Sequence, residues 1–112
     1  MSKTASRKEY LEFVLDQTSL ISGVSYRAMM GEYIVYLNEK VVGGIYDDRF
    51  LIKPFEAAKR LMPGAPREVP YEGAKEMLLV EQIDDRDFLK HLFDSIGEEL
   101  YEKNKRRKEK GA

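Results

Sequence analysis

Hydrophobic positions recur along the chain with two different periods, and each period predicts one type of secondary structure. Near the start, Ser6 and Glu9 have the spacing of a capping box, and apolar residues follow them at helical intervals. This pattern predicts a helix over about 6–20. A longer helix is predicted over about 85–104, with Asp84 as its cap. Its apolar stripe consists of Phe88, Leu89, Leu92, Phe93, Ile96 and Leu100.

Four short segments between these helices are rich in β-branched and aromatic residues, which is typical of strands. They cover residues 24–30, 33–37, 41–46 and 49–53. Short links join them, so the pattern predicts an antiparallel meander with tight hairpins. A short helix over 55–62, a proline-rich loop over 63–73 and a fifth strand over 74–80 follow. The order α-ββββ-α-β-α predicts a two-layer α+β domain, with the helices on one face of an antiparallel sheet.

The two faces of the predicted sheet are both apolar. In the second strand, Tyr33, Val35 and Leu37 share one face, whereas Ile34 and Tyr36 share the other. One helical layer covers only one of these faces. We therefore expect the second face to be a binding groove or a subunit interface, and a homodimer through the sheet or its edge is our prediction.

The length of 112 residues fits one domain, with a body over about 6–102 and a basic tail over 103–112. The chain has no cysteine, so neither a disulfide framework nor a thiolate metal site is expected. We see no apolar run that would serve as a signal peptide or a membrane span. A soluble, cytoplasmic protein that makes no membrane contact is the plain expectation.

The charge is unevenly distributed, although the net charge is only −1. Residues 9–102 contain 19 of the 20 acidic residues, so the body should repel a phosphate backbone. The tail is basic and is the candidate for weak, nonspecific contact with nucleic acid. Its candidate residues are Lys103, Lys105, Arg106, Arg107 and Lys108. The alternative is a solvated helix end that aids solubility.

Candidate chemistry is sparse. His91 is the only histidine, and its position away from the apolar stripe predicts that it faces solvent. Asp47 and Asp48 lie between two predicted strands, where aspartate suits a hairpin turn. We therefore predict no catalytic residues, no metal ligands and no cofactor. The adjacent Gly43-Gly44 pair lies within a strand and predicts a bulge or a close approach to the backbone.

A small set of residues remains as candidates for contacting a partner or an anionic ligand. They are Arg27, Tyr33, Arg49 and Lys53. Arg49 and Lys53 are four residues apart on a strand, so they project from one face, and Phe50 and Ile52 project from the other. Arginine forks suit carboxylate or phosphate groups. Ordinary exposed strand charge is the alternative interpretation.

The segment YRAMMGEYIVYLNEKVVGGIYDDRFLIKP resembles the TfoX N-terminal domain, the first half of the Sxy/TfoX competence regulators. The order of its features carries the resemblance: Tyr26-Arg27 and Met30-Gly31 precede an aromatic strand, a glycine of the third strand follows, and Asp47-Asp48 precede an apolar strand that ends in Lys53. The resemblance covers roughly residues 8–101, including PYEGAKEMLLVE and the final helix.

This resemblance implies a small α+β fold like that of secretion chaperones, with no established catalytic residues. We expect the C-terminal helical domain of those regulators to have no counterpart here. The function that it implies is a non-catalytic regulatory module that acts by protein contact and is linked to competence-type transcription regulation. Two alternatives stay open: a nucleic-acid-binding accessory protein that uses the basic tail, or a sensor of a small anionic ligand.

Overall fold

The computed structural model describes residues 7–111 of the chain, with side chains up to residue 106. Three helices and six strands follow one another in the order α-ββββ-α-β-β-α. The elements are α1 (Lys8–Gln17), β1 (Val24–Met29), β2 (Glu32–Leu37), β3 (Lys40–Ile45), β4 (Phe50–Ile52), α2 (Glu56–Leu61), β5 (Arg67–Glu68), β6 (Met77–Leu79) and α3 (Arg86–Gly111). The predicted α+β class is confirmed. One short strand, β5, is additional to the prediction and lies inside the proline-rich segment.

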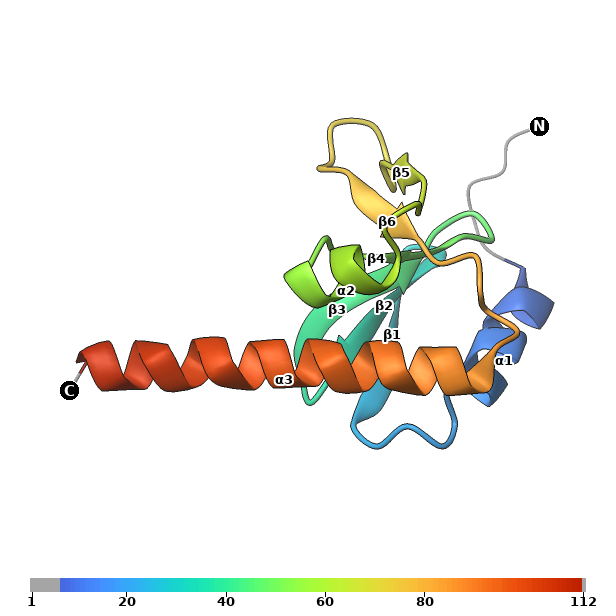
Figure 1. Cartoon of the computed structure of the whole chain (residues 1–112). Helices are drawn as coiled ribbons and strands as arrows, with labels where there is room; N and C mark the ends of the chain where they lie inside the picture. Colours follow the sequence, from blue (N-terminus) through green and yellow to red (C-terminus); the bar gives the residue numbers. More distant parts are fainter. Residues whose placement is uncertain (1–6, 112) are drawn as a thin grey trace.

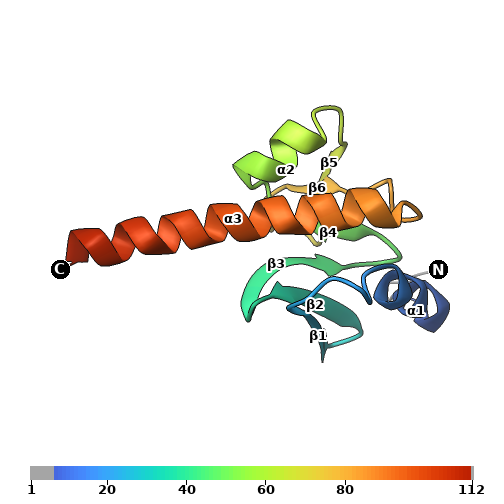
Figure 2. The same cartoon turned by 60° about the horizontal axis from the view of Figure 1, so that its bottom comes forward.

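All six strands form one antiparallel sheet in the order β1-β2-β3-β4-β6-β5. The three helices lie over the same face of this sheet, and α3 runs diagonally across it (Figure 1). Figure 2 shows β1 at one free edge of the sheet, on the side away from α2. The arrangement is therefore two layers, as the sequence predicts.

Two-residue turns join the first four strands. Asp47 and Asp48 both have left-handed backbone angles, with φ of 52° and 58°, and Tyr46 and Arg49 exchange backbone hydrogen bonds of 2.9 and 3.0 Å around them. The predicted hairpin turn is confirmed, because positive φ at both central residues is what a type I′ turn requires. Met30 and Gly31 form an equivalent turn between β1 and β2.

The core lies between the sheet and α3. Phe50 of β4 stacks on Phe93 of α3 with ring centroids 6.2 Å apart, and neither ring is exposed. Ile52 belongs to the same buried cluster, so the predicted inward face of β4 is confirmed. Val35 pairs with Gly43 and Tyr36 pairs with Val41, so Val42 is an extra residue and the bulge lies in the third strand beside the glycine pair, as predicted.

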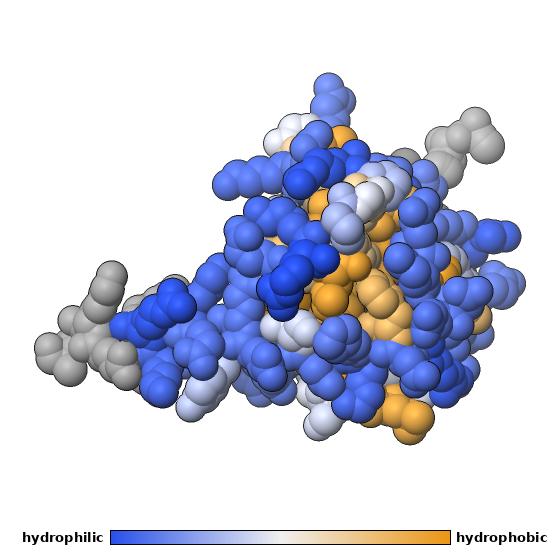
Figure 3. All heavy atoms as spheres, viewed as in Figure 1, coloured by the Kyte–Doolittle hydropathy of each residue, from blue (hydrophilic) through white to orange (hydrophobic). Residues whose placement is uncertain are grey.

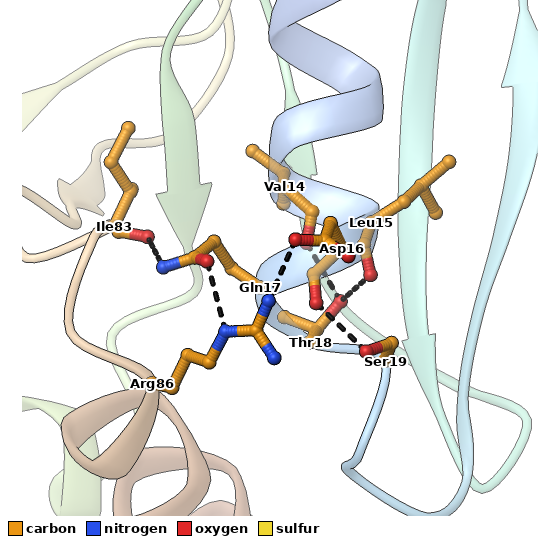
Figure 4. A network of polar contacts seen from close by, with 8 residues as sticks. All are labelled: Val14, Leu15, Asp16, Gln17, Thr18, Ser19, Ile83 and Arg86. Carbon is orange, nitrogen blue, oxygen red and sulfur yellow. Dashed lines mark hydrogen bonds and ion pairs between the residues drawn. The ribbon is translucent and has the colours of Figure 1, made fainter.

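Polar contacts fasten α1 to the start of α3 (Figure 4). Arg86 of α3 donates hydrogen bonds to Gln17 (3.1 Å) and Asp16 (2.7 Å), and the amide of the buried Gln17 donates to the carbonyl oxygen of Ile83 at 2.9 Å. Because Gln17 uses both its donor and its acceptor, its burial is compensated. These contacts fix the helical layer in place.

Three predicted details of the helix ends are wrong. The first helix begins at Lys8 after Arg7, which provides no side-chain cap, and the Ser6 of the predicted capping box lies outside the described residues. The cap of the last helix is Asp85 rather than Asp84, because Asp85 Oδ1 accepts a hydrogen bond from the Phe88 amide at 3.0 Å. The last helix also continues seven residues beyond its predicted end, to Gly111.

Candidate interaction surface on the open face of the sheet

The sheet face opposite the helices, called here the outer face, is the main surface without a helical cover. On β2, Val35 and Leu37 point to the helices and are buried, whereas Ile34 and Tyr36 point to the outer face and are half-buried. This alternation agrees with the two apolar faces in the sequence. The outer face divides into two halves with different surroundings.

The half over β4 and β6 is closed by the chain itself. Arg49 binds β5 and the residues that follow it: its guanidinium contacts the Glu68 carboxylate at 2.7 Å and donates to the carbonyl oxygen of Val69 at 3.4 Å. Tyr71 from the same segment packs edge-on against Tyr46, with ring centroids 6.3 Å apart. We call the segment 66–73 the clasp, since it is held to the sheet at both of these points.

Gly44 makes the closed half possible. A Cβ atom at this position would lie 2.6 Å from the ring of Tyr46, so only glycine lets that ring rest on the strand. Leu51 pairs with both Gly44 and Leu79 on this face and is fully buried, although it is separate from the main core cluster. The predicted close approach to the glycine pair is therefore made by an aromatic side chain of the same chain.

The other half of the outer face, over β1 and β2, is open. We call it the open patch and define it as Arg27, Met29, Ile34, Tyr36 and Val41. The side chain of Met29 is 49% exposed and that of Val41 is 41% exposed. The guanidinium of Arg27 lies 6.0 Å from the centre of the Tyr36 ring, which is the outer limit of a cation–π contact.

A shallow depression of about 360 Å³ adjoins the open patch. Ser25, Tyr26, Arg27, Tyr36 and Glu39 line it. It thus combines one cation, one anion and an aromatic ring beside the free strand β1. Such a mixture favours contact with a polypeptide, in which backbone amides, charges and apolar side chains alternate.

The four residues predicted to contact a partner or ligand do not gather in one place. Arg27 lies on the open patch, whereas Tyr33 packs against the core on the opposite face. Arg49 lies beside the closed half and binds the clasp, and Lys53 is exposed just after β4. The Arg49 guanidinium reaches the clasp on the outer face and is held there by Glu68.

The basic tail is the end of α3, which projects beyond the body (Figure 1). Lys105 and Arg106 are exposed, and Lys103 contacts Glu99 at 3.2 Å. The predicted nucleic-acid candidates Arg107 and Lys108 continue the helix, and their side chains lie outside the described residues. Figure 3 shows that the projecting part is almost wholly hydrophilic, whereas apolar atoms gather in a hollow between α3 and α2.

The aspartate pair at the β3–β4 turn has a structural role. Asp48 accepts hydrogen bonds of 2.8 Å from the backbone amide and the Nε of Arg7, and thereby ties the start of α1 to the sheet. The hydrogen bond donated by the Arg7 backbone amide, together with the Arg7 guanidinium, lowers the pKa of the Asp48 carboxyl below its usual value. The amide of Asp47 donates to Glu32 at 3.2 Å, so a residue of β2 also holds this turn.

Two other sequence predictions concern chemistry. His91 is exposed, as predicted from its position on the helix. Among residues 7–106, no group of three or more acidic, histidine or cysteine side chains is arranged to hold a metal ion. The helices described in the structure include none that is long and apolar enough to cross a membrane.

Tyr26 belongs to the depression but points its hydroxyl inward. That hydroxyl shares a hydrogen bond of 2.7 Å with the hydroxyl of Thr18. Burial raises the pKa of Tyr26 and the hydrogen bond to Thr18 offsets part of that rise, so the phenol stays neutral at physiological pH. Tyr26 therefore acts as an anchor of β1 and offers only its ring to a neighbour.

Sequence reasoning missed Glu68 and Tyr71, the two side chains of the clasp that reach the sheet. Both lie in the proline-rich segment that carries no periodic pattern, so only its length indicated a role. The missed residues explain why one half of the outer face is closed. The same missed contacts leave the open patch as the strongest candidate surface.

Comparisons with known proteins identify a relative of this chain. An uncharacterized 12.7 kDa protein in the trpE 5′ region of Spirochaeta aurantia is 35% identical over 79 residues, which make up 70% of this chain and 69% of the relative. No model of a known protein family matches the chain, and no solved structure matches it. The comparisons therefore establish a family relationship but assign no activity.

Proposed function

The chain belongs to the same family as the uncharacterized 12.7 kDa protein of Spirochaeta aurantia, and from this premise we propose that it is a non-catalytic regulatory module that works by protein contact. The division of the outer face is the observation that carries the proposal. Within residues 7–106, the clasp covers one half of this face, whereas the other half, the open patch, is exposed beside the edge strand β1. Apolar surface at a free strand edge is a favourable place for another polypeptide to add.

The open patch has the composition of a contact surface. Arg27 and Tyr36 belong to residue types that often contribute most to binding energy, and Met29 adapts its shape to different partners. The acidic body favours protein over nucleic acid as the partner of this surface. Both arguments concern binding rather than bond-breaking chemistry.

A site-specific cross-linking experiment tests this proposal. A photoreactive amino acid at position 29, within the open patch, should capture a polypeptide in cells. The matched control places it at His91, which is equally reachable but lies on α3 away from the patch. Adding Arg27→Glu should reduce capture at position 29. Equal capture at both positions, or capture that is indifferent to Arg27→Glu, would refute the proposed surface.

We further propose that the regulated process is of the competence type, as the resemblance to TfoX N-terminal domains implies. The motif order from Tyr26-Arg27 to Lys53 supports this part. Removing the gene should change transcript levels of DNA-uptake genes, and a copy with Arg27→Glu should fail to restore them. Unchanged transcripts in the deletion strain would exclude this link and leave the contact proposal to its own test.

Nucleic-acid binding by the end of α3 is a second candidate. It is favoured by the projection of exposed Lys105 and Arg106 away from the acidic body. The tail carries six basic residues, so a duplex bound by all of them would show a log K against log salt slope of about −5. Deleting residues 103–112 should abolish this binding. A salt-independent signal, or one that survives the deletion, would rule the tail out.

A further inference from the structure

The two edges of the sheet are built very differently. The edge strand β5 has only two residues, Arg67 and Glu68, and both are charged. The opposite edge strand β1 has six residues in unbroken register with β2, contains no proline, and carries Arg27 as its one charge. Natural sheets protect exposed edges by shortness, charge, proline or bulges. By these criteria β5 is protected and β1 is not.

Every second residue of β1 directs its backbone amide and carbonyl groups away from β2, where they could hydrogen-bond to another strand. The amide of Asn38 donates to the carbonyl oxygen of Gly23 at 2.8 Å, which fixes the alternation of the β1–β2 ladder. Because hydrogen-bonded positions alternate in an antiparallel pair, Ser25 and Arg27 bond to β2. The amide and carbonyl groups of Val24, Tyr26 and Ala28 therefore point to the free edge.

Exposed apolar side chains flank this edge on both faces of the sheet. On the outer face, Met29 belongs to the open patch. On the helix face, Leu15 of α1 is 36% exposed. Leu20, in the link between α1 and β1, is 79% exposed. Figure 4 shows Leu15 pointing away from Arg86, on the side of α1 opposite α3. A partner strand added to β1 would thus find apolar surface above and below it.

We propose that the occupant of this edge is a second copy of the chain, whose β1 pairs antiparallel with β1 about a twofold axis at Tyr26. This inference rests on the proposed contact function and names its partner. The register places Val24 opposite Ala28 of the second copy and Arg27 opposite Ser25 of the second copy. All three outward-pointing residues then form hydrogen-bonded pairs, and the two sheets become one continuous sheet of twelve strands.

Charge selects this register over its neighbours. Moving the twofold axis to position 27 would oppose the two Arg27 side chains, which is unfavourable for like charges directly across a ladder. Moving it to position 25 would leave the outward groups of Ala28 outside the paired strand. With the axis at Tyr26, each Arg27 meets the depression lined by Tyr36 and Glu39 of the other copy, where an anion and an aromatic face are available.

Sedimentation equilibrium of designed variants tests the pairing. The wild-type chain should form a dimer, and Ser25→Lys should weaken it roughly tenfold, because it places a lysine opposite Arg27 of the other copy at two symmetric positions. Arg27→Glu should weaken it as well, because it removes the cation that meets the depression and brings a second carboxylate toward Glu39. The double variant Ser25→Lys/Arg27→Glu should regain the dimer, since Lys and Glu then face each other. Lys53→Glu, on the same face but far from β1, is the matched control and should leave the dimer unchanged. Circular dichroism verifies folding of every variant.

Disulfide trapping tests the register. The chain has no cysteine, so an equal mixture of Ser25→Cys and Arg27→Cys chains should give a mixed disulfide under mild oxidation, well above the yield of either variant alone. A monomer at all concentrations overturns the proposal. A dimer whose dissociation constant is the same in the charge-substituted variants as in the wild type also overturns it. So does a dimer that forms no mixed disulfide. If the chain is a monomer while cross-linking at position 29 still captures another protein, the contact function stands and only the second copy is excluded.

Discussion

Glu99 of α3 caps the N-terminus of a different helix, and its removal should have a measurable cost. The carboxylate accepts hydrogen bonds from the amides of Ala57 (2.8 Å) and Glu56 (3.2 Å) at the start of α2, whose own N-cap residue, Phe55, has no capping side chain. Glu99→Ala leaves the amide of the buried Ala57 without this acceptor. We expect a loss of about 1–2 kcal/mol in the free energy of unfolding, the usual range for a lost helix cap.

The loss in unfolding free energy caused by Glu99→Ala should become smaller as the pH falls. Burial alone would raise the pKa of Glu99, but the hydrogen bond from the Ala57 amide, the contact with Lys103 and the hydrogen bond from the Glu56 amide together lower it below the ordinary 4.5. A carboxyl whose pKa is lower in the folded state stabilises the fold fully above 4.5 and loses this contribution as the pH falls through the folded value. The stability gap between wild type and variant should therefore narrow in acid.

Urea unfolding followed by circular dichroism measures this gap at neutral pH and in steps below the ordinary pKa. Glu98→Ala is the matched control, because Glu98 is the exposed neighbour on the same helix and the substitution has the same effect on helix propensity. The Glu98 variant should stay within about 0.5 kcal/mol of wild type. Equal losses in the two variants, or a Glu99 gap that is constant with pH, would refute the cross-helix cap.

Three further substitutions probe the sheet. Gly44→Val should cost about 1–3 kcal/mol in unfolding free energy, because its side chain would displace the Tyr46 ring; an unchanged urea midpoint would contradict this. Asp47→Asn should change that energy by less than about 0.5 kcal/mol, since asparagine tolerates the φ of 52°, and a larger loss would give Asp47 a role beyond the turn. Arg49→Ala removes the ion pair that ties Glu68 of the clasp to Arg49 and should speed tryptic cleavage within 66–73 while circular dichroism stays native; an unchanged cleavage rate would contradict the tether.

The hairpins could be predicted from sequence because their determinants are local. Alternating apolar residues define each strand, and the residues between strands accept positive φ, as at Asn38 and Asp47. The strand β5 escaped prediction for the opposite reason. It has two residues, too few to show a period, and it exists because Arg67 and Glu68 pair with Leu78 and Met77 of β6.

The helix ends were harder to predict because distant residues or weak signals decide them. The Arg7 amide is bound by Asp48, 41 residues away, and nothing near Arg7 in the sequence indicates this contact. At the other end, the apolar stripe stops at Leu100, but the lysines and glutamates that follow are good helix formers and continue α3 to Gly111. The choice between Asp84 and Asp85 as the cap is a one-residue difference that periodicity does not resolve.

The candidate site was only partly predictable, because sequence spacing assigns a side chain to a face but not to a partner. Arg49 projects from the face that its spacing predicts, yet the structure uses it to hold Glu68. Tyr33 was predicted to contact a partner together with Arg27. Successive side chains on a strand alternate between its two faces, however, and Tyr33 lies on the face that packs against the core. Arg27 is the one of the four that belongs to the open patch.

The bulge of the β2–β3 pair lies in β3, next to the glycines that the closed half of the outer face depends on. Val35 pairs with Gly43 and Tyr36 pairs with Val41, so Val42 is the extra residue, and an extra residue in one strand increases the local twist. On one side of the bulge, the Tyr46 ring lies over Gly44 and the clasp packs against it. On the other side, Met29 and Val41 remain exposed. The Tyr46 ring on Gly44 thus gives the clasp a surface to pack on, whereas β1, at the opposite edge, is the strand that we propose for contact with a partner.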